Sequence, residues 1–180
     1  MRHFYLIGGP MGVGKSAVCR VLKRRLSNCV FLDGDWCWDM DPFQVTEETK
    51  TMVMSNIADV LNRFLACSAF EHVVFCWVMH RQEVIDDLLS RLNCTGWAVH
   101  QISLVCRMEV LCDRLERDIA RGLREPDVLG RSATYLSLYQ ELSTARLDCS
   151  DLSIEETAER ILAMERPDGI CPCKGINTLL

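Results

Sequence analysis

Apolar residues recur along this chain at two alternating periods, which predicts strands and helices in turn. Short apolar runs predict strands at residues 4–7, 29–32, 73–79, 97–105 and 146–149. Between them, apolar residues at helical spacing predict helices at about residues 17–26, 47–65, 84–92, 107–121, 135–142 and 154–164. Five strands that alternate with helices indicate a parallel sheet covered on both faces, which is a three-layer α/β/α sandwich.

Turn and cap signals place several of the predicted boundaries. Residues 36–43 are predicted to form a loop, and Thr46 precedes the long amphipathic helix. Ser153 and Glu156 have the spacing of a capping box, so the last helix begins directly after Ser153. The apolar residues 73–79 form an unbroken run, which favours a strand that is buried on both faces of the sheet.

The composition fits one globular domain with a sizeable core, because 49% of the 180 residues are hydrophobic. We expect this domain to span residues 1–166 and the tail, residues 167–180, to be frayed or loosely docked. The net charge of -5 gives no basic field for nucleic acid, and the longest apolar run of seven residues is too short for a membrane span. Eleven cysteines at scattered spacings match no metal motif and indicate a reducing, cytoplasmic location.

The strongest chemical signal is the string G-x-x-x-x-G-K-S between the first predicted strand and helix. Backbone N–H groups of such a loop surround phosphate oxygens, its lysine reaches the β- and γ-phosphates, and its serine hydroxyl binds Mg²⁺. The residues expected to hold ATP and Mg²⁺ are Gly9, Gly12, Val13, Gly14, Lys15, Ser16 and Ala17. The alternative is a glycine-rich turn without a ligand.

Two carboxylates, Asp33 and Asp35, end the second predicted strand. Two residues apart on an extended segment, they are predicted to project to the same side. One would hold Mg²⁺ and the other would accept the proton of a substrate hydroxyl. The alternative is that they only form a turn. The run at residues 73–79 ends in His80 and Arg81 without an acid, so a motor-type ATPase is not indicated.

Arginines are concentrated after the fourth predicted strand. The set consists of Arg107, Arg114, Arg117, Arg121 and Arg124. At about 100° per residue they fall on one helical stripe, which could close over the triphosphate and stabilise the transferred phosphoryl group. In that hypothesis Arg114 contacts the nucleotide, and Arg117 and Arg121 act in catalysis. The alternative is a solvated face paired with Asp113, Glu116 and Asp118.

A loop with Gly122, Pro126 and Gly130 interrupts the chain after these arginines. We therefore expect residues 117–131 to form a mobile lid. Trp36, Trp38, His80 and Arg81 follow the second and third predicted strands, on the rim where ligands of parallel sheets bind. These four are the candidates for an acceptor pocket. Alternatively, the two tryptophans cap the core, and His80 is either a hydrogen-bonded residue at the strand end or a catalytic base.

Taken together, these segments resemble the P-loop small-molecule kinases. Residues 9–16 match their phosphate loop, residues 32–35 are similar to the L-D-G-D element of adenylyl-sulfate and gluconate kinases, and the arginine-rich helix is similar to their lid. Residues 150–160 are similar to the adenine-side loop and final helix of the chloramphenicol phosphotransferase and tunicamycin-resistance branch. The resemblance, which includes shikimate kinases, covers the chain to about residue 165.

The resemblance implies a P-loop NTPase fold with sheet order 2-3-1-4-5, in which Asp33 faces the metal, Asp35 faces the acceptor and Asp151 lies on the adenine side. It implies an ATP-dependent phosphotransferase that moves the γ-phosphoryl group to a hydroxyl of a small molecule. No arginine follows Asp35 as in adenylyl-sulfate kinases, and Trp36 and Trp38 stand there instead. The identity of the acceptor and the oligomeric state remain open. Two alternative functions also remain: a nucleotide-binding regulator, which the missing N-K-x-D motif disfavours, and a non-catalytic ligand-binding module.

Overall fold

Five strands form one parallel sheet in the computed structural model, which describes residues 1–164. They are β1 (Arg2–Gly8), β2 (Cys29–Asp33), β3 (His72–Cys76), β4 (Trp97–Val105) and β5 (Ala145–Asp148). Their order is β2-β3-β1-β4-β5, which confirms the predicted topology. The predicted tail, residues 167–180, lies outside the described residues.

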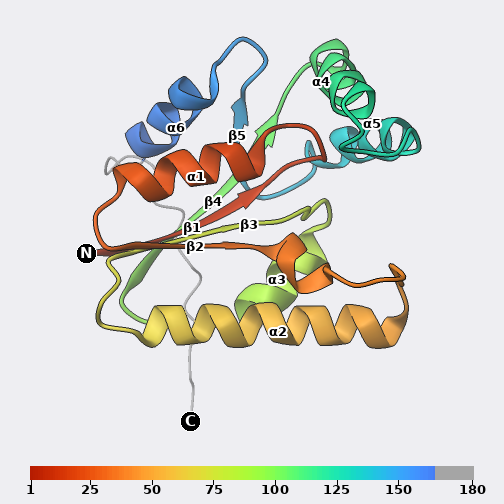
Figure 1. The fold of residues 1–180 in the computed structure, drawn as a ribbon. Coiled ribbons are helices and arrows are strands. Elements are labelled where there is room, and N and C mark those ends of the chain that lie inside the picture. Colours follow the sequence, from red (N-terminus) through yellow and green to blue (C-terminus); the bar gives the residue numbers. More distant parts are fainter. Residues whose placement is uncertain (165–180) are drawn as a thin grey trace.

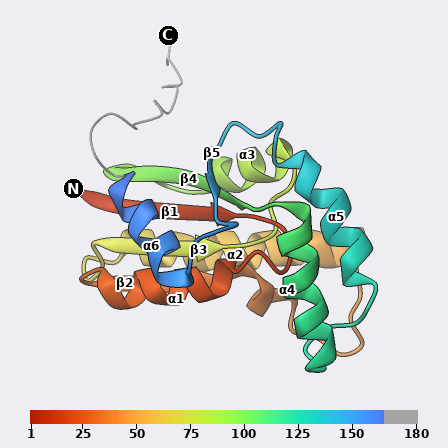
Figure 2. The same ribbon diagram turned by 90° about the horizontal axis from the view of Figure 1, so that it is seen from above.

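Helices cover both faces of this sheet (Figures 1 and 2). They are α1 (Lys15–Arg25), α2 (Glu47–Ala66), α3 (Gln82–Ser90), α4 (Met108–Ala120), α5 (Val128–Leu138) and α6 (Ile154–Ala163). Figure 1 shows α1 and α6 on one face and α2 and α3 on the other, with α4 and α5 beyond the end where β1 leads into the next loop. The predicted three-layer sandwich is confirmed. No helix within residues 1–164 is long and apolar enough to span a bilayer.

The central strands have continuous apolar sequences because helices bury both of their faces. The side chains of Phe4 to Ile7 in β1 and of Val73 to Cys76 in β3 are almost fully buried. In the register of the sheet, Ile7 lies beside Cys76 on one side and Ile102 on the other. This core holds the carboxyl ends of the strands in place, and the loops that follow those ends form the site.

Some boundaries differ from the sequence prediction. Strand β3 ends at Cys76 rather than residue 79, and the predicted loop after β2 begins with a 3-10 helix, η1 (Gly34–Trp38). Helix α5 begins at Val128 and includes Gly130, which the sequence placed in a loop. Val128, Ser132 and Leu136 are spaced by four and buried, so packing outweighs the cost of about 1 kcal/mol of a glycine inside a helix.

Two helix starts were predicted correctly because their signals are local. Thr46 caps α2, and its side chain accepts a hydrogen bond from the backbone N–H of Thr49. Ser153 and Glu156 form the predicted capping box at α6, in which the Ser153 N–H donates to Glu156 Oε2 at 2.8 Å. This cap positions the first turn of α6 beside the loop after β1.

Candidate active site

The loop between β1 and α1 is shaped by glycines. Gly12 has φ of 82°, and a Cβ at this position would lie 2.5 Å from Leu115 Cδ2 in α4. Gly14, with φ of 105°, precedes α1 as its N-cap and supplies no side-chain hydrogen bond. The first backbone N–H groups of α1 are therefore available to an anion at the positive end of the helix dipole.

Lys15 lies at the centre of this loop and is only 8% exposed. Its Nζ donates hydrogen bonds to the carbonyl oxygens of Gly9 at 2.8 Å and Pro10 at 2.9 Å. Burial lowers the pKa of Lys15, and the nearby carboxylates of Asp35 and Asp33 oppose that shift. The loop thus holds a buried cation beside the anion-binding end of α1.

Ser16 and Asp33 meet beside Lys15. Ser16 Oγ donates a hydrogen bond of 2.6 Å to Asp33 Oδ2, which joins the start of α1 to the end of β2. Asp33 is 5% exposed, and its other oxygen accepts a hydrogen bond from the Asp35 N–H at 3.2 Å. A hydroxyl and a carboxylate oxygen fit Mg²⁺, which commonly takes one or two protein oxygens together with phosphates and waters.

Asp35 lies in η1 rather than on the extended segment that the sequence predicted. The extended geometry predicted for residues 33–35 is therefore wrong, because the chain turns directly after Asp33 and the Asp33 side chain caps the turn; both carboxylates nevertheless lie near Lys15. Asp35 instead lines a hollow with Lys15, Ser16 and Arg124. Desolvation, followed by the charge of Asp33, raises the pKa of Asp35, while Lys15 and Arg124 lower it. A carboxylate of raised pKa is suited to accept a proton.

Three hollows join around this loop. The phosphate hollow, about 240 Å³ in volume, contains Asp35 and residues of the loop together with Arg20, Asp118 and Arg124. It shares Gly12, Gly14 and Asp118 with a nucleotide hollow of about 360 Å³. On its other side it shares Met11 and Asp35 with an aromatic hollow of about 520 Å³. The phosphate hollow thus adjoins both of the others, and the three adjoining hollows are called the cleft below.

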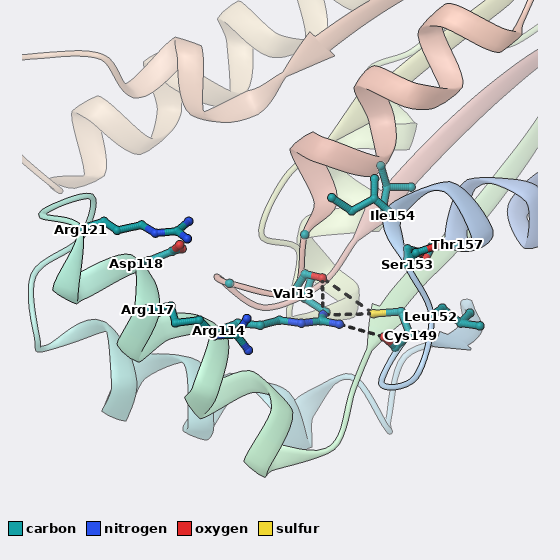
Figure 3. Close-up of a pocket in the computed structure, with 13 residues that line it drawn as sticks. Val13, Arg114, Arg117, Asp118, Arg121, Cys149, Leu152, Ser153, Ile154 and Thr157 are labelled. Atoms are coloured by element: carbon teal, nitrogen blue, oxygen red, sulfur yellow. Dashed lines mark hydrogen bonds between the residues drawn. The ribbon is translucent and has the colours of Figure 1, made fainter.

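The nucleotide hollow lies between the loop, α4 and the start of α6 (Figure 3). Arg114 reaches across it: one guanidinium nitrogen donates to the Val13 carbonyl oxygen at 3.0 Å, and the other donates to the Cys149 carbonyl oxygen at 3.0 Å. Arg117 and Arg121 line the hollow from α4. Arg117 Nε also donates to the Asp113 carbonyl oxygen of its own helix.

Only part of the predicted arginine stripe is present: Arg114, Arg117 and Arg121 line one hollow, whereas Arg107 and Arg124 do not line it. Arg107 precedes α4 in an extended conformation and pairs with Asp151 through two hydrogen bonds of 2.7 and 2.6 Å. Arg124 follows the end of α4 and pairs with Asp118 at 3.1 Å, which is the predicted alternative for that residue. A helix of thirteen residues is too short to carry all five arginines. Asp151, expected on the adenine side, is held by Arg107 and does not line the hollow.

The four residues predicted to form the acceptor pocket lie in two separate hollows. Trp36 and Trp38 line the aromatic hollow, whereas His80 and Arg81 line a different hollow of about 560 Å³ with residues of α3 and the chain after α5. The two hollows share no lining residue. The His80 ring stacks on Tyr135 at 4.0 Å between centroids, and burial lowers its pKa. The predicted grouping is therefore corrected, since β3 ends early and the chain turns away before residue 80.

Several residues of the cleft carry no motif. No sequence motif marks the lining residues Arg20, Cys149, Thr157, Trp77 and Asp39. Most of them follow the carboxyl end of a strand or lie one turn inside a helix that begins there, and this placement is the signal that could have found them.

A model of the AAA domain family matches residues 6–127, more than half of the chain. The chain belongs to this family. Its structure is similar to the tunicamycin resistance protein of Deinococcus radiodurans, with 22% identity, TM-score 0.70 and coverage of 91% of this chain and 95% of that one. A gluconokinase from Sinorhizobium meliloti 1021 has 20% identity and TM-score 0.65, with coverage of 91% and 92%.

The APS kinase of Mycobacterium tuberculosis, solved in complex with AMPPNP and APS, is also similar, with 17% identity, TM-score 0.60 and coverage of 91% and 96%. A search of the curated proteins finds no match to the sequence. The chain therefore has the P-loop kinase-like fold, with small-molecule kinases among its structural neighbours.

Proposed function

We propose that this protein is a cytoplasmic kinase that transfers the γ-phosphoryl group of ATP, with Mg²⁺, to a hydroxyl group of a small molecule. The position of Asp35 carries this proposal. Asp35 lines both the phosphate hollow and the aromatic hollow, so a carboxylate stands where a triphosphate and a second molecule would meet. A nucleotide-binding regulator needs no such second hollow or base.

In this proposal the nucleotide occupies the cleft between α4 and α6, with its phosphates at the start of α1. Lys15 and the first N–H groups of α1 hold the β- and γ-phosphates, and Arg117 and Arg121 contribute positive charge from α4. Ser16 and Asp33 hold Mg²⁺, which, when bound, neutralises charge on the phosphate oxygens. Arg114 acts as a positioning residue because it ties α4 to the loop and to Cys149.

The transfer itself requires a base at the acceptor. Asp35 accepts the hydroxyl proton while the hydroxyl oxygen forms a bond to the γ-phosphorus. The bond between that phosphorus and the β–γ bridging oxygen breaks, and ADP leaves.

Buried thiols at Cys19, Cys76, Cys106 and Cys149 support a reducing, cytoplasmic location.

Two of the structural neighbours support the same class of reaction. One is a gluconokinase and another is an APS kinase whose complex contains AMPPNP. The test is an assay of ADP formation by the full chain with Mg²⁺ across a library of hydroxyl-bearing metabolites. We expect at least one acceptor to raise ADP formation and to yield a phosphorylated product of matching mass. Slow ATP turnover that no acceptor raises would favour the regulator.

A further inference from the structure

The aromatic hollow is built from rings whose positions are fixed by packing. Three of the four tryptophans in the chain, Trp36, Trp38 and Trp77, line it together with Phe43. Trp36 is 56% exposed and Phe43 is 63% exposed, so both present ring surface to an incoming molecule. Exposed aromatic rings gathered in one hollow are typical of a binding site.

Neighbouring residues hold these rings in place. Trp36 packs edge-on against Phe31 at 5.6 Å, and Trp38 lies 5.7 Å from Phe43. Trp77 lies directly under Gly34, where a Cβ would come within 2.6 Å of Trp77 Cγ. These contacts restrict Trp36, Trp38 and Trp77, which reduces the reordering of their side chains that binding would require.

The charges of this hollow are of one sign. Asp35 and Asp39 are its charged lining residues, and none of the described residues that line it is Lys, Arg or His. Lys15 and Arg124 lie on the phosphate side of Asp35. Their positive charges offset the negative charge of Asp35 and lower its pKa. Asp39 forms no salt bridge within residues 1–164. A solvent-exposed carboxylate with no ion-pair partner among the described residues thus stands beside the aromatic rings.

We propose that the acceptor is a cation, namely a hydroxyl-bearing amine or quaternary ammonium compound; this inference rests on the proposed function. Its positive charge lies over the aromatic rings near Asp39, where cation–π attraction and the carboxylate act together. Its hydroxyl lies at Asp35, where the new O–P bond forms, the bond from the γ-phosphorus to its bridging oxygen breaks, and the proton passes to Asp35. A carboxylate- or sulfate-bearing acceptor would meet repulsion and no lining cation.

A matched set of probes tests the charge preference. Three benzyl alcohols share one ring and one hydroxymethyl group and differ in the opposite substituent: 4-(aminomethyl)benzyl alcohol, 4-methylbenzyl alcohol and 4-(hydroxymethyl)benzoate. Binding to the full chain with AMPPNP and Mg²⁺ is followed by tryptophan fluorescence, since most of the tryptophans line the hollow. We expect the amine to bind at least tenfold more tightly than the other two probes. Equal affinities, or tighter binding of the benzoate, overturn the inference.

Variants at Asp39 test whether the charge at this position, rather than a change in the net charge of the protein, sets the preference for the amine. Asp39→Lys is expected to weaken amine binding at least tenfold and to strengthen benzoate binding, and Asp39→Asn is expected to abolish the preference. Asp59→Lys makes the same charge change at an exposed position in α2, outside the hollow, and is expected to keep the wild-type order. If Asp39→Lys has a native circular dichroism spectrum and still binds the three probes in the wild-type order of affinity, the inference is overturned.

Product analysis keeps the two proposals apart. If the amine binds preferentially but no phosphorylated product forms with it or with any library acceptor, the cation site stands and the kinase proposal fails. If the protein phosphorylates the benzoate faster than the amine, the kinase proposal stands and the cation inference fails.

Discussion

Lys15 acts as a charge rather than as part of the hydrophobic core. It is buried, but its Nζ contacts only the carbonyl oxygens of Gly9 and Pro10 among the described partners. We expect Lys15→Ala to reduce phosphoryl transfer at least a hundredfold, which corresponds to about 3 kcal/mol at the transition state. ADP formation with the identified acceptor measures this effect, and thermal unfolding should show that the fold survives. Lys23→Ala, at an exposed position of the same helix, is the control and should keep full activity.

Asp33 and Asp35 are two residues apart but face different partners. Asp33 contacts Ser16, and Asp35 faces the junction of two hollows. We expect Asp35→Asn to lower kcat about a hundredfold with little change in ATP affinity, because only proton transfer is affected. We expect Asp33→Asn to raise the Mg²⁺ concentration for half-maximal activity about tenfold. Steady-state kinetics in ATP and in Mg²⁺ separate the two. If both variants keep full turnover, the acidic pair serves only to shape the turn.

Elements with local signals were predictable, whereas elements shaped by packing were not. Helix α6 was located from its capping box, and β4 has the predicted bounds of residues 97–105. The start of α5 was missed because a buried face overrides the loop signal of Gly130. At the site, the phosphate-loop motif lies between β1 and the start of α1, as its glycines and flanking apolar residues predicted. The separation of His80 from Trp36 depends on where β3 ends, which no spacing in the sequence reports.

The segment that joins α4 to α5 is the part of the site best suited to move. Residues 121–127 are all exposed, and the ion pairs that hold it, Arg124 with Asp118 and Arg131 with Asp127, lie at the surface, where such pairs contribute little stability. We expect hydrogen exchange across residues 117–131 to slow when AMPPNP, Mg²⁺ and the identified acceptor bind together, because phosphate draws Arg117 and Arg121 inward.

Helix α2 provides the internal reference for that measurement. It covers the opposite face of the sheet from α1 and α6, and its last turns lie away from η1 and the aromatic hollow, so hydrogen exchange in those turns should change little on binding. Equal exchange of residues 117–131 with and without ligands would show that their arginines are simply solvated.

At the scale of the whole molecule, the cleft and a group of histidines lie toward opposite ends of the sheet. The cleft lies at the carboxyl ends of the strands, and the histidines His3 and His72 lie near the amino ends of β1 and β3. His3 Nδ1 is 3.0 Å from His100 Nε2, and the His3 ring stacks on His72 at 5.7 Å. Protonation of both His3 and His100 would place like charges side by side in a partly buried region, so the fold favours neutral imidazoles at these two positions.

Acid should therefore weaken the fold through these histidines. Burial is the main cause that lowers the pKa of both His3 and His100, with further lowering from His72 on the first and from His3 on the second. Because the folded protein then binds fewer protons than the unfolded chain, their stabilising contribution is present above about pH 6.5 and is lost as the pH falls below that value. Chemical unfolding at pH 7.5, 6.5 and 5.5 should give a decreasing free energy of unfolding, and the double variant His3→Gln/His100→Gln should show a shallower decrease. The same variant should keep the wild-type pH profile of phosphoryl transfer, since the cleft lies at the other end of the strands. If the free energy of unfolding falls with pH equally in the double variant and in the wild type, the acid sensitivity belongs to other groups.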